Sequence, residues 1–190
     1  ILDLQNNGGG YVSAAEEVTG LFPGAKNAYT EKNASGEKVV HAKRQSVQFP
    51  TNTRVLINGY SASASEMTAA ALVDQNAAIL YGEKTYGKGT MQSFYELSDG
   101  SYLKLTMAKF AGPVATAINE VGVSPHIETT HNALYKAHYD TIVEQYPQYK
   151  ELSSLHNVPT TKTFTLNFNN IVNIVPDGAI ELVQLGENGI

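Results

Sequence analysis

Short apolar runs and longer stretches with helical spacing alternate through the first half of the chain. Ile1 to Gln5 and Arg54 to Asn58 are apolar runs of strand length, and a third covers residues 78–81. Each of the first two leads into a loop of small residues and then into apolar positions at helical spacing, from about Tyr11 to Phe22 and up to about Gln75. Strands that alternate with helices in this way predict an α/β fold with parallel strand pairing.

The pattern changes in the middle of the chain. Residues 90–96 and 102–110 are β-like runs joined at Ser98-Asp99-Gly100, which is a strong hairpin signal. Residues 38–49 alternate loosely enough for a strand at the margin of the sheet, whereas residues 23–37 are polar and loop-like. We therefore expect a twisted mixed sheet with helices packed on it.

The last third of the chain has a different character. Residues 132–152 have a loose helical period, which Pro147 ends or breaks. Apolar residues then alternate with polar ones between 161 and 185, which predicts a small C-terminal β appendage. We divide the chain into a core at 1–130, a helical segment and linker at 131–158, and a β-rich tail or the start of a further module at 159–190.

Composition and charge exclude several classes of protein. The chain has 190 residues, of which 42% are hydrophobic and 16% charged, so it can form one sizeable globular core. A net charge of −5 without clusters of Lys or Arg argues against a nucleic-acid partner. The absence of cysteine excludes disulfides, thiolate metal sites and cysteine nucleophiles. We expect no metal and no cofactor, because neither a His-Glu-x-x-His motif nor a complete phosphate-binding glycine motif is present.

The chain opens directly on an apolar run. Ile1-Leu2-Asp3-Leu4 has the pattern of a buried strand, and no Met or signal segment precedes it. Natural chains rarely begin inside their own core. We therefore expect this sequence to be part of a longer precursor.

The turn from Gly59 to Glu66 consists of small residues apart from one tyrosine and the glutamate, and it joins a strand to an apolar helix. A helix N-terminus offers unpaired N–H donors and a partial positive charge, which suit a developing oxyanion. A serine in this turn is therefore a candidate nucleophile. Ser63 and Glu66 are also spaced as a capping box, so a purely structural cap is the alternative, and the two roles are compatible.

A serine nucleophile needs a base, and the histidines are poor candidates. All five stand in unconstrained contexts typical of surface or packing residues: His41, His126, His131, His138 and His156. A lysine amine can replace histidine where burial lowers its pKa from about 10.4. Lys88, between two glycines, is the candidate, and a solvated loop lysine is the alternative.

Four blocks of sequence occur in a recognisable order. The first block runs from Asp3 to Gly10, the second from Ser61 to Glu66, and the third from Gly82 to Gln92. A weaker fourth block lies between Leu97 and Pro125. Together they resemble the carboxyl-terminal processing proteases, the tail-specific serine peptidases of family S41. The resemblance covers residues 1 to about 128, and it implies a fold related to the crotonase-like proteins.

The resemblance also implies roles for single residues. Ser63 falls on the family's nucleophile, Lys88 on its general base and Gln92 on the glutamine that helps to orient the lysine. The oxyanion hole falls on the backbone N–H groups of Ala64 and Gly9.

The alignment of the first block does not separate Gly9 from Gly8 and Gly10, so all three glycines stay open as oxyanion donors. Asp74 matches a family position as well, but it lies three helical turns from Ser63, so we interpret it as structural.

The sequence departs from the family pattern at several places. The family usually carries a PDZ domain, which this chain lacks, and His126 stands where an acidic residue is usual. Neither departure touches Ser63 or Lys88. The resemblance thus implies a serine endopeptidase that cleaves proteins near their C-termini, acts outside the cytoplasm, works with an upstream PDZ-containing region and can form homo-oligomers. The alternatives are a catalytically silent binding or scaffold module and a different Ser/Lys amidohydrolase.

Overall fold

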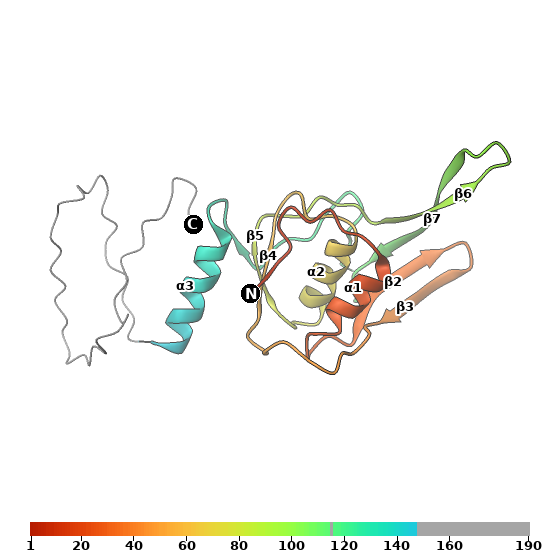
Figure 1. Cartoon of the computed structure of the whole chain (residues 1–190). Coiled ribbons are helices and arrows are strands. Elements are labelled where there is room, and N and C mark those ends of the chain that lie inside the picture. The colour runs from red at the N-terminus through yellow and green to blue at the C-terminus, as the bar shows by residue number, and fades with distance from the viewer. Residues whose placement is uncertain (115, 148–190) are drawn as a thin grey trace, which may run out of the picture. The chain divides into compact units, whose positions relative to one another are not determined.

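The computed structural model describes residues 1–114 and 116–147 (Figure 1). A compact unit extends from Ile1 to Gln145, and a second unit starts at Tyr146. The β appendage predicted at 161–185, and the end of the helix predicted to reach 152, lie outside the described residues. The described elements are β1 (Leu2–Asp3), α1 (Val12–Thr19), β2 (Asn27–Asn33), β3 (Gly36–His41), β4 (Arg54–Ile57), α2 (Ala64–Asp74), β5 (Ile79–Gly82), β6 (Thr90–Glu96), β7 (Tyr102–Ala111), β8 (Ile127–Glu128) and α3 (Ala133–Gln145).

The strands form two four-stranded sheets. The first has the order β1-β4-β5-β8 and is parallel throughout, and the second has the order β3-β2-β7-β6 and is antiparallel throughout. The predicted α/β class is confirmed, with the parallel and antiparallel pairings divided between two sheets. Figure 1 shows α1 and α2 between the two sheets and α3 on the other face of the parallel sheet.

The parallel sheet is covered on both faces, which explains the continuous apolar runs of β4 and β5. Val55, Ile57 and Leu80 belong to the main core with α1 and α2. Leu56 and Tyr81 point to the opposite face and pack against Ala133 and Ala137 of α3. Successive side chains of a strand face opposite sides, so one run of apolar residues serves two layers.

Three expectations about the strands are wrong in whole or in part. Residues 23–37, interpreted as a loop, contain β2, and the predicted strand at 38–49 is β3, which ends at His41. Only Ala28 and Tyr29 of β2 are buried, so its sequence lacks the alternation by which a half-buried strand is recognised. β1 is an edge strand of two residues, Leu2–Asp3, and neither is buried. Of residues 1–5 only Leu4 is buried, so this is not the buried strand expected.

The three helices are short. Their lengths are 8, 11 and 13 residues, and no helix in the described part of the chain is long and apolar enough to cross a membrane. α2 is almost entirely buried, since its first nine residues are all buried. A helix enclosed in this way fixes the position of the turn that precedes it.

Gly82 ends β5 at a point where only glycine fits. Its φ is +121°, and an added Cβ would overlap the carbonyl oxygen of Ile57 on the neighbouring strand. Gly36 has a similar φ of +131°, but an added Cβ there meets no atom within 4 Å. Alanine substitutions at the two glycines can therefore be compared to separate the cost of a positive φ from the cost of steric overlap.

We predict that Gly82→Ala destabilises the protein by about 2 kcal/mol more than Gly36→Ala. Both variants pay for a positive φ, at about 1–3 kcal/mol, but only Gly82→Ala also pushes β4 and β5 apart. Urea unfolding of the two variants measures the difference. Equal free energies of unfolding would contradict the close approach of Gly82 to Ile57.

Candidate functional site

Three loops meet at the carboxyl edge of the parallel sheet, where ligands commonly bind in α/β proteins. They follow β1, β4 and β5, and they carry the glycines, the serines and Lys88. The N–H of Ala62 donates to the carbonyl of Asn7 at 3.0 Å, and the N–H of Tyr86 donates to the carbonyl of Ser61 at 3.0 Å. The serine loop is thus bonded to the glycine loop on one side and to the lysine loop on the other.

Ser63 is the N-cap residue of α2 and has an unusual backbone conformation. Its φ of 58° and ψ of −115° lie in a region that residues other than glycine rarely adopt. The predicted capping box is present, and the Ser63 N–H donates to Glu66 Oε2 at 2.8 Å. A serine held on a strained strand-to-helix turn matches the geometry by which other hydrolases present a nucleophilic hydroxyl.

The three serines of the turn differ in their surroundings. Ser61 is fully buried, and its hydroxyl donates to the Leu4 carbonyl at 2.7 Å and accepts the Asn58 N–H at 3.0 Å. Ser65 is buried as well. Ser63 is partly exposed. Of these three, Ser63 is the serine that a substrate in solution can reach.

Glu66 connects the serine turn to the lysine loop. Its side chain is fully buried, and its Oε2 accepts the backbone N–H groups of Ser63 and Lys88, both at 2.8 Å. Its Oε1 accepts the Gly87 N–H and the Thr85 hydroxyl, both at 2.6 Å. Four hydrogen bonds to a carboxylate compensate for the loss of water around its charge. The backbone nitrogens of Ser63 and Lys88 therefore meet at a single oxygen atom.

Sequence reasoning gave Glu66 a capping role and missed this connection. The available signal is its place in the sequence, because Glu66 lies in the first turn of an apolar helix that offers it no other charged or polar partner than Thr68 up to residue 73. A carboxylate there must find donors outside its own helix once the helix is buried. The sequence did not reveal which loop supplies them.

The lysine loop is fixed from its other side by residues 118–123, part of the fourth sequence block. Thr85 and Val123 exchange two bonds, from the Thr85 N–H to the Val123 carbonyl at 3.0 Å and from the Val123 N–H to the Thr85 hydroxyl at 2.7 Å. The Glu120 N–H donates to the Gly87 carbonyl at 2.8 Å. An added Cβ at Gly122 would overlap the Thr85 carbonyl oxygen, so this block packs directly on the loop.

No hydrogen bond joins the side chains of Lys88 and Gln92 in the described part of the chain. Lys88 is half-buried, and its amine makes no hydrogen bond or ion pair with any described residue. The Gln92 amide nitrogen donates to the Thr90 hydroxyl at 2.7 Å, along its own strand. The role of Gln92 in orienting Lys88 stays a prediction.

The predicted oxyanion donors lie beside Ser63. An added Cβ at Gly9, whose φ is +91°, would be 2.7 Å from the Ala64 nitrogen, so glycine is required for this approach. The Ala64 N–H has no acceptor among the bonds of the described residues. The Gly9 N–H donates to Asn7 Oδ1 at 2.9 Å and is therefore occupied in this structure. Sequence reasoning did not foresee this bond.

Asp74 and His126 form hydrogen bonds that hold neighbouring segments of the fold together. Asp74, at the end of α2, accepts bonds from the Val114 N–H at 2.8 Å and from the Thr116 hydroxyl, as its structural interpretation predicted. The His126 Nδ1 accepts the Leu80 N–H at 3.0 Å, and burial lowers the pKa of this histidine. His126 is thus a packing residue, as expected.

Comparison with known proteins shows which proteins this chain resembles. The sequence profile of Peptidase family S41 matches residues 1–129. The chain resembles the chloroplastic C-terminal processing peptidase of Tetradesmus obliquus, with 36% identity over 129 residues that cover 67% of this chain and 28% of that protein. It also resembles a probable CtpA-like serine protease of Staphylococcus aureus, with 33% identity over 167 residues that cover 86% of this chain and 30% of that protein.

A solved structure shows the same likeness. The photosystem II D1 C-terminal processing protease aligns with a TM-score of 0.62 and 35% identity, over 68% of this chain and 34% of that one. The two curated relatives are much longer than this chain, which spans 28% and 30% of their lengths.

We predict that Glu66→Gln destabilises the protein by about 2–6 kcal/mol. The amide replaces one acceptor oxygen by an NH₂ group, which leaves two buried donors without a partner at about 1–3 kcal/mol each. Urea unfolding measures this change. Glu83→Gln is the matched control, because Glu83 is exposed in the same loop region and should change stability by less than about 0.5 kcal/mol. Equal stability of the two variants would show that the four bonds to Glu66 are not formed.

Proposed function

This chain belongs to peptidase family S41, and we propose that it carries the catalytic residues of a serine endopeptidase that cleaves proteins near their C-termini. The names of its relatives support this proposal, since they are C-terminal processing peptidases and a probable serine protease. The nucleophile is Ser63 and the general base is Lys88.

One observation carries the proposal. A single oxygen of the buried Glu66 carboxylate accepts the backbone N–H groups of both Ser63 and Lys88. Two residues separated by 25 positions are thereby fixed on either side of one atom, at a strained helix start that faces solvent. These bonds hold the backbones of both residues in place beside an accessible serine, as a Ser/Lys pair requires.

The proposed reaction proceeds through an acyl-enzyme. Lys88 Nζ, in its neutral form, takes the proton of the Ser63 hydroxyl while Oγ forms a bond with the carbonyl carbon of the substrate. The negative charge on the carbonyl oxygen faces the Ala64 N–H and, once the Asn7 side chain releases it, the Gly9 N–H. The C–N bond then breaks, and the leaving amine takes the proton from Lys88. A water molecule hydrolyses the ester in the same way, and Oγ recovers its proton.

We extend the proposal to the location, the partners and the substrate of the protein. We place it outside the cytoplasm, with an upstream PDZ-containing region as a partner and homo-oligomers as a possible assembly. The chloroplastic location named for several relatives fits an enzyme that acts after transport across a membrane. The substrate is an extended protein C-terminus.

We predict that a fluorophosphonate probe labels Ser63 and that Ser63→Ala abolishes the labelling. Peptide mapping by mass spectrometry identifies the modified residue. Ser65→Ala is the matched control and retains labelling, because its side chain is buried. Labelling of Ser61 or Ser65 would contradict the assignment. Failure of both this chain and the full-length protein to react would favour the scaffold alternative, and labelling without cleavage of any protein would favour another amidohydrolase.

We predict that Lys88→Ala and Lys88→Arg both reduce labelling by at least about a hundredfold, the lower range for loss of a general base. The arginine variant is decisive, because a guanidinium keeps the positive charge but stays protonated and cannot accept the serine proton. Lys84→Arg, at an exposed position of the same loop region, should leave the rate unchanged. An active Lys88→Arg variant would exclude Lys88 as the base.

A further inference from the structure

Two Asn-Gly pairs lie at the candidate site, one in the loop after β1 and one in the loop after β4. They are Asn7-Gly8 and Asn58-Gly59, and a third pair, at 188–189, lies outside the described residues. Asparagine followed by glycine deamidates more readily than other pairs, because glycine has no Cβ to obstruct the approach of its nitrogen to the asparagine side chain. Both pairs at the site therefore have the covalent structure that this reaction needs.

The two asparagine side chains share one type of contact. The Gly9 N–H donates to Asn7 Oδ1 at 2.9 Å, and the Tyr60 N–H donates to Asn58 Oδ1 at 3.1 Å. Such a bond polarises the side-chain carbonyl and stabilises the negative charge that forms on Oδ1 when a nitrogen attacks Cγ. The Gly9 N–H, proposed above as an oxyanion donor for a substrate, thus faces an amide of its own loop.

Asn58 is restrained by further bonds, and Asn7 is not. Asn58 Oδ1 also accepts the Asn6 N–H at 3.0 Å, and Asn58 Nδ2 donates to Asn6 Oδ1 at 3.1 Å. The Asn7 side chain makes no hydrogen bond other than the one from Gly9 within the described part of the chain. Deamidation requires the side chain to turn until Cγ meets the next backbone nitrogen. Asn58 must therefore break two additional bonds before it reacts.

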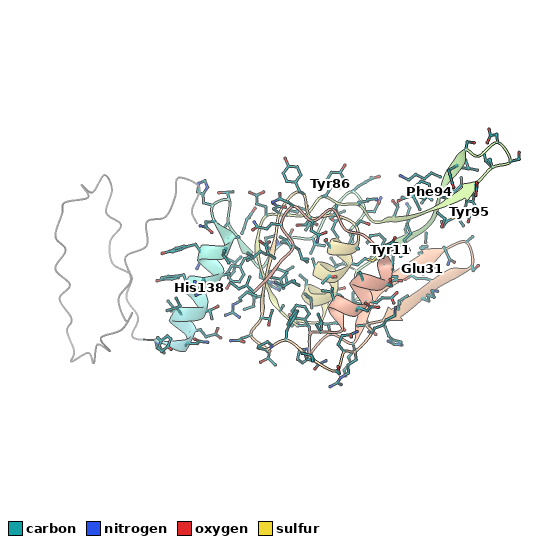
Figure 2. All side chains as sticks on the ribbon, in the orientation of Figure 1. Tyr11, Glu31, Tyr86, Phe94, Tyr95 and His138 are labelled. Carbon is teal, nitrogen blue, oxygen red and sulfur yellow. The ribbon has the colours of Figure 1, made fainter. Side chains whose placement is uncertain are left out.

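The Asn7-Gly8 pair is also open to solvent. Asn7 and the glycines that follow it are exposed, whereas Asn58 and Gly59 are half-buried. The Gly8 N–H makes no hydrogen bond in the described part of the chain, and an added Cβ at Gly8 meets no atom within 4 Å. Figure 2 shows Tyr11, the residue after the glycines, whose side chain is 85% exposed. Water therefore has free access to this loop.

We propose that Asn7 is a site of spontaneous deamidation, and that the carboxylate formed there inactivates the site by holding the Gly9 N–H. The deamidation itself depends only on the Asn7-Gly8 pair and its surroundings. The inactivation rests on the proposed function, because it requires the Gly9 N–H as an oxyanion donor.

The reaction consumes water and no other reactant. The Gly8 nitrogen loses its proton to solvent and forms a bond with Asn7 Cγ, the bond from Cγ to Nδ2 breaks, and ammonia leaves after it takes up a proton. Water then opens the cyclic imide at either carbonyl, which gives aspartate or isoaspartate. The aspartate accepts the Gly9 N–H in a charge-assisted bond, about twice as strong as a neutral one. The isoaspartate adds a methylene to the main chain before Gly9.

The test incubates this chain at mildly alkaline pH and follows Asn7 and Asn58 by peptide mapping. Mass spectrometry gives the extent of deamidation at each asparagine, and an isoaspartate methyltransferase with labelled S-adenosylmethionine detects the isomer. We expect Asn7 to react at least about fourfold faster than Asn58, since each of the two additional bonds of Asn58 is worth roughly a factor of two or more. Equal rates, or an intact Asn7, would overturn the modification site.

Two glycine variants locate the reaction. Gly8→Ala adds a Cβ in open space next to the attacking nitrogen and should slow the deamidation of Asn7 severalfold. Gly59→Ala adds the same group after Asn58, 3.8 Å from the Lys84 carbonyl oxygen, and should leave the rate at Asn7 unchanged. Neither glycine has a positive φ, so both variants should fold. Equal effects of the two variants on Asn7 would contradict attack by the Gly8 nitrogen.

The effect on activity is measured with the fluorophosphonate probe. Labelling of Ser63 should fall in parallel with intact Asn7, each sample being compared with its own rate before incubation, and it should fall more slowly in Gly8→Ala. Asn7→Asp supplies the carboxylate directly and should lower the rate of labelling at least about tenfold, since loss of one oxyanion donor costs about a hundredfold or more. Asn52→Asp, which adds the same charge at an exposed position before β4, should leave the rate unchanged.

The outcomes separate this inference from the proposed function. If Asn7 deamidates but Asn7→Asp is labelled at the native rate, the inactivation is wrong and the modification site stands. If neither this chain nor the full-length protein is labelled before incubation, the proposed function fails and the inactivation fails with it. The extent of deamidation at Asn7 is read by mass in either case.

Discussion

The buried carboxylate of Glu66 is the group on which the rest of the site depends. It has no cationic partner among the described residues, and four donors from two loops surround it instead. A carboxylate without water is tolerated only when such donors are in place. The requirement acts in both directions, because the loops that carry Ser63 and Lys88 are held where the carboxylate needs them.

The surrounding fold keeps Glu66 buried and keeps its hydrogen-bond donors in place. α2 is enclosed between the two sheets, so Glu66 cannot turn towards water (Figure 1). The lysine loop is fixed from its other side, where Val123 and Gly122 pack against its Thr85. The fourth sequence block, which is weak as a motif, therefore has a definite physical function: it supports the loop that donates to Glu66. Asp74 holds residues 114 and 116 at the far end of the same helix.

The sequence predicted the elements whose signal is local. The apolar runs of β4 and β5, the small-residue turn before α2 and the hairpin of β6 and β7 are each recognisable without knowledge of a partner. β2 could not be predicted in this way, because its polar residues become a strand only through pairing with β3 and β7. Propensity and periodicity contain no information about such a partner.

The site shows the same division between local and long-range signals. The motif blocks indicated Ser63, Lys88 and Gly9, and the structure brings their loops together. The directions of individual side chains were not predictable: Gln92 bonds to Thr90, and Asn7 occupies the Gly9 N–H. An amide side chain can form several different hydrogen bonds, and its neighbours in space decide which one forms. In the proposed reaction, the substrate carbonyl competes with the Asn7 amide for the Gly9 N–H.

Amide hydrogen exchange measured by NMR tests the central claim most directly. The claim is that one buried carboxylate holds the backbones of Ser63, Gly87 and Lys88. We expect these three amides to exchange slowly in the native protein and to lose protection together in Glu66→Gln, while the amides of β4 and β5 stay protected. Rapid exchange of the three amides in the native protein, at rates typical of an exposed loop, would contradict the account.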